Sequence, residues 1–242
     1  TGSKTLNTNI HRLLPGHYMI YENGTLSFSR YWSLEFLPDE KKIDKGLDAF
    51  VNEGKALFQS SLALRKRSDV PMGVFLSGGL DSSAVVAGLA QHESDTIKTF
   101  SVRFDNAEFG EGFDESEFAK DVSDKFQTEH KVITMTPKMF EDFIPKFVSM
   151  MDEPVTEAAA ISLHFVSELA KDDVTVVLSG EGSDEIFAGY DLYRYMAAVE
   201  KIRNLITPGG ARLLQKVCDK ILPPGNKIRK YARLINLPFE SR

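Results

Sequence analysis

The chain has 242 residues, of which 42% are hydrophobic and 26% are charged, and its formal net charge is −6. This length fits one large domain, or one domain with a small addition, that buries a core without disulfides or metal. The single cysteine, Cys218, excludes a disulfide framework, and no 18-residue apolar run or signal-peptide pattern is present. We therefore expect a cytoplasmic protein with no membrane partner. The five histidines lack metal-ligand spacing, so no zinc site is predicted.

The first 38 residues differ in pattern from the rest. Apolar and polar residues alternate on both sides of Asn23-Gly24, a dipeptide typical of tight β-hairpins. Pro38 and the charged stretch 39–42 then mark a boundary. We predict a hairpin and linker over residues 1–38 and a main domain over 39–242, which opens with a helix between residues 43 and 67.

The middle of the chain alternates short apolar runs with helical patterns. Strands are predicted at 72–79, 97–104, 130–135 and 174–180, and helices at 81–91, 114–126, 137–151 and 157–171. This alternation predicts an α/β fold with a parallel sheet flanked by helices on both faces. Helical patterns continue from Ser183 to the end, with breaks at 208–210 and 223–225, and predict a helical C-terminal region.

The C-terminal region is basic. Residues 201–242 contain ten Lys or Arg and two acidic residues. A basic segment of this kind can bind nucleic acid, but the solvated faces of amphipathic helices explain it equally simply. We favour the second interpretation and expect no nucleic-acid partner.

A glycine- and serine-rich motif stands where the first predicted strand passes into a helix. Amides at the start of a helix attract anions, and glycines let the backbone approach them. The Walker A lysine is absent, and a carboxylate among phosphates calls for Mg²⁺ between them. An ordinary turn capped by Asp81 and Ser82 is the alternative. The candidate ATP-binding residues here are Leu76, Ser77, Gly78, Gly79, Asp81, Ser82 and Ser83.

A second motif, residues 180–185, follows the last predicted strand. It places three acidic residues, Glu181, Asp184 and Glu185, where a parallel strand ends and a helix begins. Ligand sites of α/β proteins form at such ends. A helix start with acidic first-turn residues is the alternative interpretation.

The two motifs together resemble a known family. The first resembles the pyrophosphate loop of the N-type ATP pyrophosphatases, which split ATP between the α- and β-phosphates. The second resembles the asparagine synthetase signature, including Phe187, Gly189 and Tyr190. The resemblance implies an adenine nucleotide alpha hydrolase-like fold and the cofactors ATP and Mg²⁺. It implies that Asp81 and Asp184 hold the metal, that Gly180 contacts the nucleotide, and that Glu181 and Asp184 are catalytic.

Other segments resemble the same family. By that resemblance, Ser101 and Val102 contact adenine through their backbone, and Asp152, Glu153 and Glu157 bind the acceptor acid. At 157–160 the chain departs from the serine pair that many members carry, which leaves the identity of the acid open.

The N-terminal hairpin resembles the last hairpin of the family's glutaminase domain. That domain uses an N-terminal cysteine, whereas this chain starts with Thr1, and the family's catalytic lysine falls beyond residue 242. The resemblance thus implies part of a glutamine-hydrolysing ligase, with ammonia delivered by a glutaminase part outside this sequence. A homodimer is one option for its assembly.

These observations lead to one main hypothesis. The chain adenylates a carboxylate, with aspartate as the first choice, and ammonia then displaces AMP to give the amide. The alternatives are a relative acting on a different acid, a tRNA-modifying enzyme with the same loop, and a nucleotide-binding chain without turnover.

Overall fold

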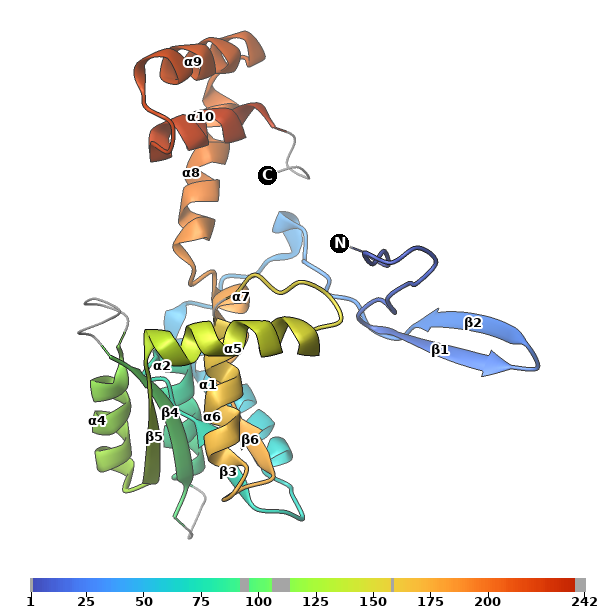
Figure 1. Cartoon of the computed structure of the whole chain (residues 1–242). Helices are drawn as coiled ribbons and strands as arrows, with labels where there is room; N and C mark the ends of the chain where they lie inside the picture. The colour runs from blue at the N-terminus through green and yellow to red at the C-terminus, as the bar shows by residue number, and fades with distance from the viewer. Residues whose placement is uncertain (1, 92–95, 106–113, 158, 238–242) are drawn as a thin grey trace. The chain divides into compact units, whose positions relative to one another are not determined.

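The computed structural model describes residues 2–91, 96–105, 114–157 and 159–237. The chain divides into two compact units, residues 1–179 and residues 180–242. Figure 1 traces both along the chain. The predicted division at residue 38 falls within the first of these units and stays a prediction.

A four-stranded parallel sheet forms the centre of the first unit. Its strand order is β5-β4-β3-β6, so that β3 (Met72–Phe75) pairs with both β4 (Lys98–Phe104) and β6 (Val176–Leu178). The outer strand β5 (Glu129–Met135) pairs with β4 along its whole length. The prediction of a parallel sheet built from these four segments is confirmed.

Helices cover both faces of this sheet (Figure 1). Val74 and Leu76 point to one face, where they pack against α1 (Leu47–Arg65), α2 (Leu80–Leu89) and α4 (Ser116–Phe126). Successive strand residues point to opposite faces, so Phe75 and its neighbour Phe100 pack instead against α6 (Ala159–Ala170). Met135 joins α6 to α5 (Pro137–Met150) on that second face. The fold is therefore a three-layer α/β arrangement, as predicted.

The N-terminal hairpin is present as predicted. β1 (His17–Glu22) pairs with β2 (Thr25–Arg30) in antiparallel register, with Glu22 opposite Thr25. Asn23 and Gly24 connect the strands with φ of 50° and 76°. Two successive positive φ angles identify a type I′ turn, which matches the twist of the strands. A short 3-10 helix, η1 (Asp39–Lys41), follows the hairpin before α1 begins.

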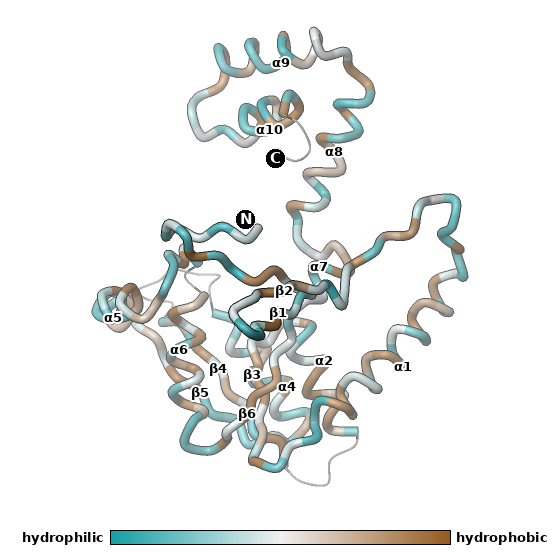
Figure 2. Tube along the Cα trace, turned by 90° about the vertical axis from the view of Figure 1, so that its right-hand side faces the viewer, coloured by the Kyte–Doolittle hydropathy of each residue, from teal (hydrophilic) through white to brown (hydrophobic). Residues whose placement is uncertain are grey.

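The second unit is helical. It contains α7 (Ser183–Phe187), α8 (Asp191–Leu205), α9 (Pro208–Ile221) and α10 (Lys227–Asn236). Val199, Ala211 and Ile235 form its small core. In Figure 2, the traces of α9 and α10 alternate between hydrophilic and hydrophobic residues along their turns. That alternation is typical of amphipathic helices and agrees with the predicted C-terminal region.

Two details of the helix predictions are wrong. The break expected at 208–210 is the beginning of α9, because Thr207 caps the helix by accepting from the Gly210 amide at 3.2 Å. Proline suits the first position of a helix, where its missing N–H has no partner to lose. The helix expected from Ser183 is instead interrupted at Ala188, whose φ of 55° ends α7. No helix among the described residues is long and apolar enough to span a bilayer.

Candidate active site

The first glycine-rich motif forms a tight loop between β3 and α2. Gly78 has φ of +89°, a backbone conformation that residues with a side chain rarely adopt. A Cβ at this position would lie 2.7 Å from the Glu115 carbonyl oxygen and 2.8 Å from the Ala119 amide nitrogen. Both atoms belong to backbone at the start of α4, so they cannot swing aside. Gly78 therefore lets the loop lie directly against α4.

Serine hydroxyls hold the loop from inside. The Ser82 hydroxyl, in a residue only 5% exposed, accepts from the Ser77 amide at 3.2 Å and lies 3.0 Å from the Ser77 hydroxyl. The Ser77 hydroxyl also accepts from the Gly79 amide at 3.2 Å. Ser83 donates to the Gly79 carbonyl at 2.7 Å. The loop thus fixes its own shape through hydrogen bonds across the motif.

The beginning of α2 is open to an anion. Gly79 is the N-cap residue, and no side chain caps the helix. The first amides of a helix have no partner within the helix and carry partial positive charge. Asp81 lies in this first turn and is partly exposed. The loop and helix start together provide backbone donors with one carboxylate beside them, the combination that phosphates bridged by a cation require.

The edge of β4 next to this loop has unpaired backbone. The β3–β4 pairing stops at Phe75 and Phe100, whereas β4 continues to Phe104. The Phe100 carbonyl accepts from the Leu76 amide at 2.9 Å, so the backbone groups of Phe100 point toward β3. Alternation along a strand gives Val102 the same direction, beyond the last residue of β3. Val102 therefore directs its amide and carbonyl past the end of β3.

Two residues predicted to bind the nucleotide have side chains that make other contacts. The Leu76 side chain is 1% exposed and belongs to the core. Ser101 is 3% exposed, and its hydroxyl donates to the Leu76 carbonyl. Their side chains hold β3 and β4 in place at the start of the loop, and the Leu76 amide and carbonyl are bonded to the Phe100 carbonyl and the Ser101 hydroxyl.

The second motif starts two residues after β6, and the structure places it in the second unit. Gly182, with φ of +100°, precedes α7, and the left-handed Ala188 follows it. The Asp184 side chain lies over Gly189, where a Cβ would collide with the carboxylate. Asp184 is partly exposed, and Glu181 is exposed.

Tyr190 and Glu185 form a pair within this motif. The Tyr190 hydroxyl donates to Glu185 Oε1 at 2.9 Å. This hydrogen bond, followed by the negative charge of Glu185, raises the pKa of Tyr190 to about 12. Tyr190 is therefore a neutral hydrogen-bond donor at physiological pH. Its partner is Glu185, whereas Glu181 and Asp184 are the carboxylates of the motif that it does not bond.

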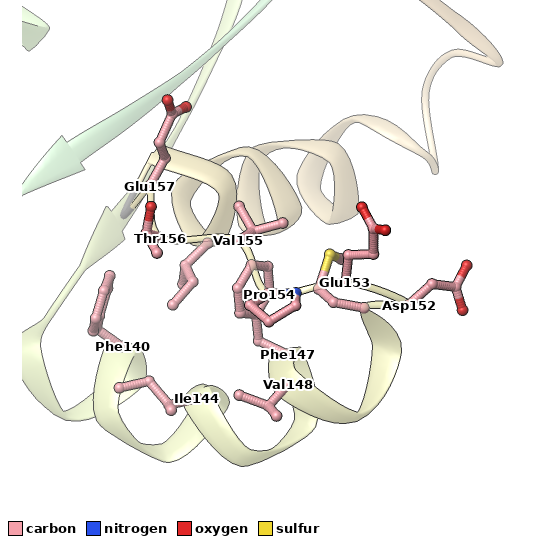
Figure 3. Close-up of a pocket in the computed structure, with 12 residues that line it drawn as sticks. Phe140, Ile144, Phe147, Val148, Asp152, Glu153, Pro154, Val155, Thr156 and Glu157 are labelled. Atoms are coloured by element: carbon pink, nitrogen blue, oxygen red, sulfur yellow. The ribbon is translucent and has the colours of Figure 1, made fainter. Parts of the chain in front are cut away.

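The segment predicted to bind the acceptor acid borders a pocket of about 380 Å³ (Figure 3). One wall is α5, from which Phe140, Ile144 and Val148 face Pro154 and Val155 on the segment. The carboxylates of Asp152, Glu153 and Glu157 stand at the rim and point away from α5 (Figure 3). The pocket interior is apolar, and its twelve described lining residues include no Lys, Arg or His.

Asp81 and Asp184 have the chemistry that Mg²⁺ requires. Within the described ranges, no group of three or more His, Cys, Asp or Glu side chains is placed to hold a metal. Mg²⁺ in nucleotide sites is held by one or two carboxylates together with phosphate oxygens, so a protein-only cluster is not needed. Single accessible carboxylates beside an anion-binding loop and over Gly189 fit this role.

Comparison with known proteins now bears on this arrangement. Residues 53–237 match the family model described as asparagine synthase. The chain belongs to the asparagine synthase family. Both glycine-rich motifs and the acceptor segment lie within the matched range.

The similar proteins support the same assignment. Asparagine synthetase [glutamine-hydrolyzing] 1 of Bacillus subtilis is 34% identical over 98% of this chain and 36% of its own length. A putative asparagine synthetase of Methanocaldococcus jannaschii is 38% identical over 81% of this chain and 37% of its own length. Amidase chyE of Penicillium rubens is 31% identical over 79% of this chain and 30% of its own. The chain thus spans between 30% and 37% of the length of these relatives.

Similarity to solved structures is weaker. The NMN synthetase of Francisella tularensis aligns over 60% of this chain and 59% of its own, with a TM-score of 0.40 and 16% identity. Similarity at this level supports no statement about function.

Sequence reasoning missed the apolar wall of the pocket and a contact from the N-terminal segment. The spacing of Phe140, Ile144 and Val148 predicts a helix face, but not which face borders a ligand. The missed contact joins Arg12 to Glu153, and no sequence pattern marks residues 141 positions apart as partners.

Proposed function

We propose that the chain is the synthetase part of an ATP-dependent, amide-forming amidotransferase. Its carboxylate substrate attacks the α-phosphorus of ATP, pyrophosphate leaves, and ammonia displaces AMP from the acyl-adenylate. The observation that carries this proposal is the 77–83 loop. Its internal bonds fix the backbone, and the uncapped start of α2 places amides and Asp81 after the end of a parallel strand. Membership of the asparagine synthase family supports the amide-forming half of the reaction.

The loop has a defined task in this reaction. Negative charge develops on the pyrophosphate as it leaves, and donors already fixed in place stabilise that charge without reorganisation. We assign this role to the Gly78 amide, the first amides of α2 and the backbone of Gly180, while the bonds among Ser77, Gly79, Ser82 and Ser83 hold the loop in shape. Leu76, Ser101 and Val102 would border the adenine side through their backbone atoms.

Each motif supplies one candidate metal ligand: Asp81 comes six residues after the end of β3, and Asp184 comes six residues after the end of β6. Membership of the asparagine synthase family supports a shared metal. We propose that both hold Mg²⁺, which would neutralise the leaving pyrophosphate. Glu181 would accept the proton that ammonia loses as it attacks.

A second candidate keeps the chemistry and changes the acid. The α5 pocket has an apolar interior and carboxylates at its rim, and its twelve described lining residues include no Lys, Arg or His; Arg12, beside the rim, is already paired with Glu153. An acid with an apolar body would fit this lining better than aspartate, whose α-carboxylate would meet Asp152, Glu153 and Glu157. One of the similar proteins, from Penicillium rubens, is an amidase by name and not an asparagine synthetase.

One assay tests both candidates. Pyrophosphate release from MgATP would be measured for the full-length protein, with ammonia and a panel of polar and apolar carboxylic acids. Release stimulated by aspartate, with asparagine formed, supports the first candidate, and stimulation by an apolar acid alone supports the second. If no acid stimulates release, the proposal is wrong, and tRNA or simple nucleotide binding becomes the next hypothesis.

A further inference from the structure

The segment between α5 and α6 has few internal restraints. Residues 151–157 form neither helix nor strand, although they build one side of the pocket in Figure 3. Pro154 limits the conformation of the residue before it, Glu153, but supplies no hydrogen-bond donor. A segment like this needs an outside contact to hold a binding geometry.

An ion pair from the N-terminal segment supplies that contact. The Arg12 guanidinium donates to Glu153 Oε2. Among the described residues, this is the one side-chain hydrogen bond or ion pair that reaches segment 151–157. Glu153 is the more buried partner, with 31% of its side chain exposed against 51% for Arg12.

The Glu153 carboxylate depends on this partner. Its second oxygen, Oε1, is buried and has no hydrogen-bond partner in the described structure. A partly buried carboxylate that lost its one guanidinium would turn toward water, because an unpaired charge costs most where it is desolvated. Asp152 and Pro154, on either side of Glu153, line the same pocket, so a backbone shift that carried the Glu153 carboxylate to water would move the pocket wall.

Arg12 itself is held in place. Its amide donates to the Ser3 carbonyl at 2.8 Å, and Lys4 and His11 form a β-bridge beside it. Four residues later, just before β1, the chain passes Gly16, where a Cβ would collide with the Trp32 carbonyl. The guanidinium therefore extends from backbone that is anchored on both sides.

We infer that Arg12 is a positioning residue for the acceptor site: by pairing with Glu153 it holds segment 151–157 against α5. The inference rests on the proposed function for its effect on catalysis, but not for its effect on the segment. Arg12 acts through Glu153 and touches no reacting atom.

The first test measures the segment directly. A spin label would be attached at Val155→Cys in a Cys218→Ala background of this chain. Arg12→Met should increase label mobility and Arg12→Lys should retain most of the restraint. Arg65→Met should change nothing, since Arg65 donates to Ser61 within α1. Identical spectra for Arg12→Met and the parent would overturn the inference, whether or not the protein is an enzyme.

The second test measures catalysis in the full-length protein. Arg12→Met should raise the KM for the acid about two- to fivefold, the upper part of the range for one partly exposed ion pair, with the KM for ATP unchanged. Arg12→Lys should recover part of the loss. Equal effects on both KM values would overturn the positioning role. If the label responds but the unmodified protein releases no pyrophosphate with any acid, the proposed function fails and the restraint on the segment stands.

Discussion

The two glycine-rich motifs follow neighbouring strands of one sheet, yet they are built differently. The 77–83 loop is fixed by its own serines and lies against backbone at the start of α4. The second motif, residues 180–185, belongs to the second unit, and the residues from Glu185 to Tyr190 are exposed. The first motif is therefore shaped before any ligand arrives, whereas the geometry of the second depends more on what binds to it.

The residues of the two motifs have different tasks. In the first, several residues serve structure: Gly78 permits a close approach and Ser82 fills a buried position with a satisfied hydroxyl. In the second, the acidic groups face solvent and make few contacts in the described structure. Substitutions should therefore affect folding in the first motif and chemistry in both.

The largest effect is expected from the two proposed metal ligands. Asp81→Asn and Asp184→Asn should each lower acid-dependent pyrophosphate release by at least about 10²–10³-fold, the cost of removing one group that stabilises developing charge. Asp191→Asn is the matched control, because Asp191 pairs with Arg194 in the first turn of α8 and should leave the rate near normal. A near-normal rate for Asp81→Asn would remove that residue from the metal site.

The next effect concerns the backbone of the first motif. Gly78→Ala should lower the free energy of unfolding by about 3 kcal/mol, because it combines a strained φ with a clash against backbone atoms. Gly54→Ala, in the interior of α1 with open space around it, should instead raise stability by about 1 kcal/mol. Urea unfolding of the two variants would measure both changes. Equal stability of the two would contradict the tight packing of the loop on α4.

The serines of the first motif provide a smaller contrast. Ser82→Ala should cost about 1–3 kcal/mol, because the Ser77 amide loses its acceptor in a buried place. Ser83→Ala should cost about 0.5 kcal/mol, since its hydroxyl bonds only to the carbonyl one turn back. Thermal unfolding of both variants would show which one loses more stability. A larger loss for Ser83→Ala would show that the internal bonds of the loop are assigned to the wrong serine.

The smallest effect lies in the second motif. The hydrogen bond to Glu185 raises the pKa of Tyr190 to about 12, so the folded state binds this proton more tightly than the unfolded state, whose tyrosines titrate near 10. The stability that the pair contributes is present below pH ~10 and is lost as the pH rises toward ~12. Glu185→Gln should lower the Tyr190 pKa toward its ordinary value, measured as phenolate absorbance against a Tyr190→Phe reference. An unchanged titration would mean that the pair does not form.

The local elements of this fold could be predicted from the sequence. The hairpin at Asn23-Gly24 and the four apolar strands depend on turn chemistry and residue period, which act between near neighbours. The loop at 77–83 belongs to the same class, because its glycines and serines bond mainly to one another. The errors came where context outweighed propensity: Pro208 begins a helix after Thr207, and Ala188 ends one in a left-handed conformation.

The sequence by itself determined the fold class, the two motifs and the family, because each depends on residues within short stretches of the chain. Only the tertiary structure decided which atoms of those stretches remain open to a ligand. It placed Leu76 and the Ser101 hydroxyl in the core, and it left the Val102 backbone beyond the last residue of β3. It also joined Arg12 to Glu153. Contacts between distant residues follow from how layers pack, and packing depends on the whole chain at once.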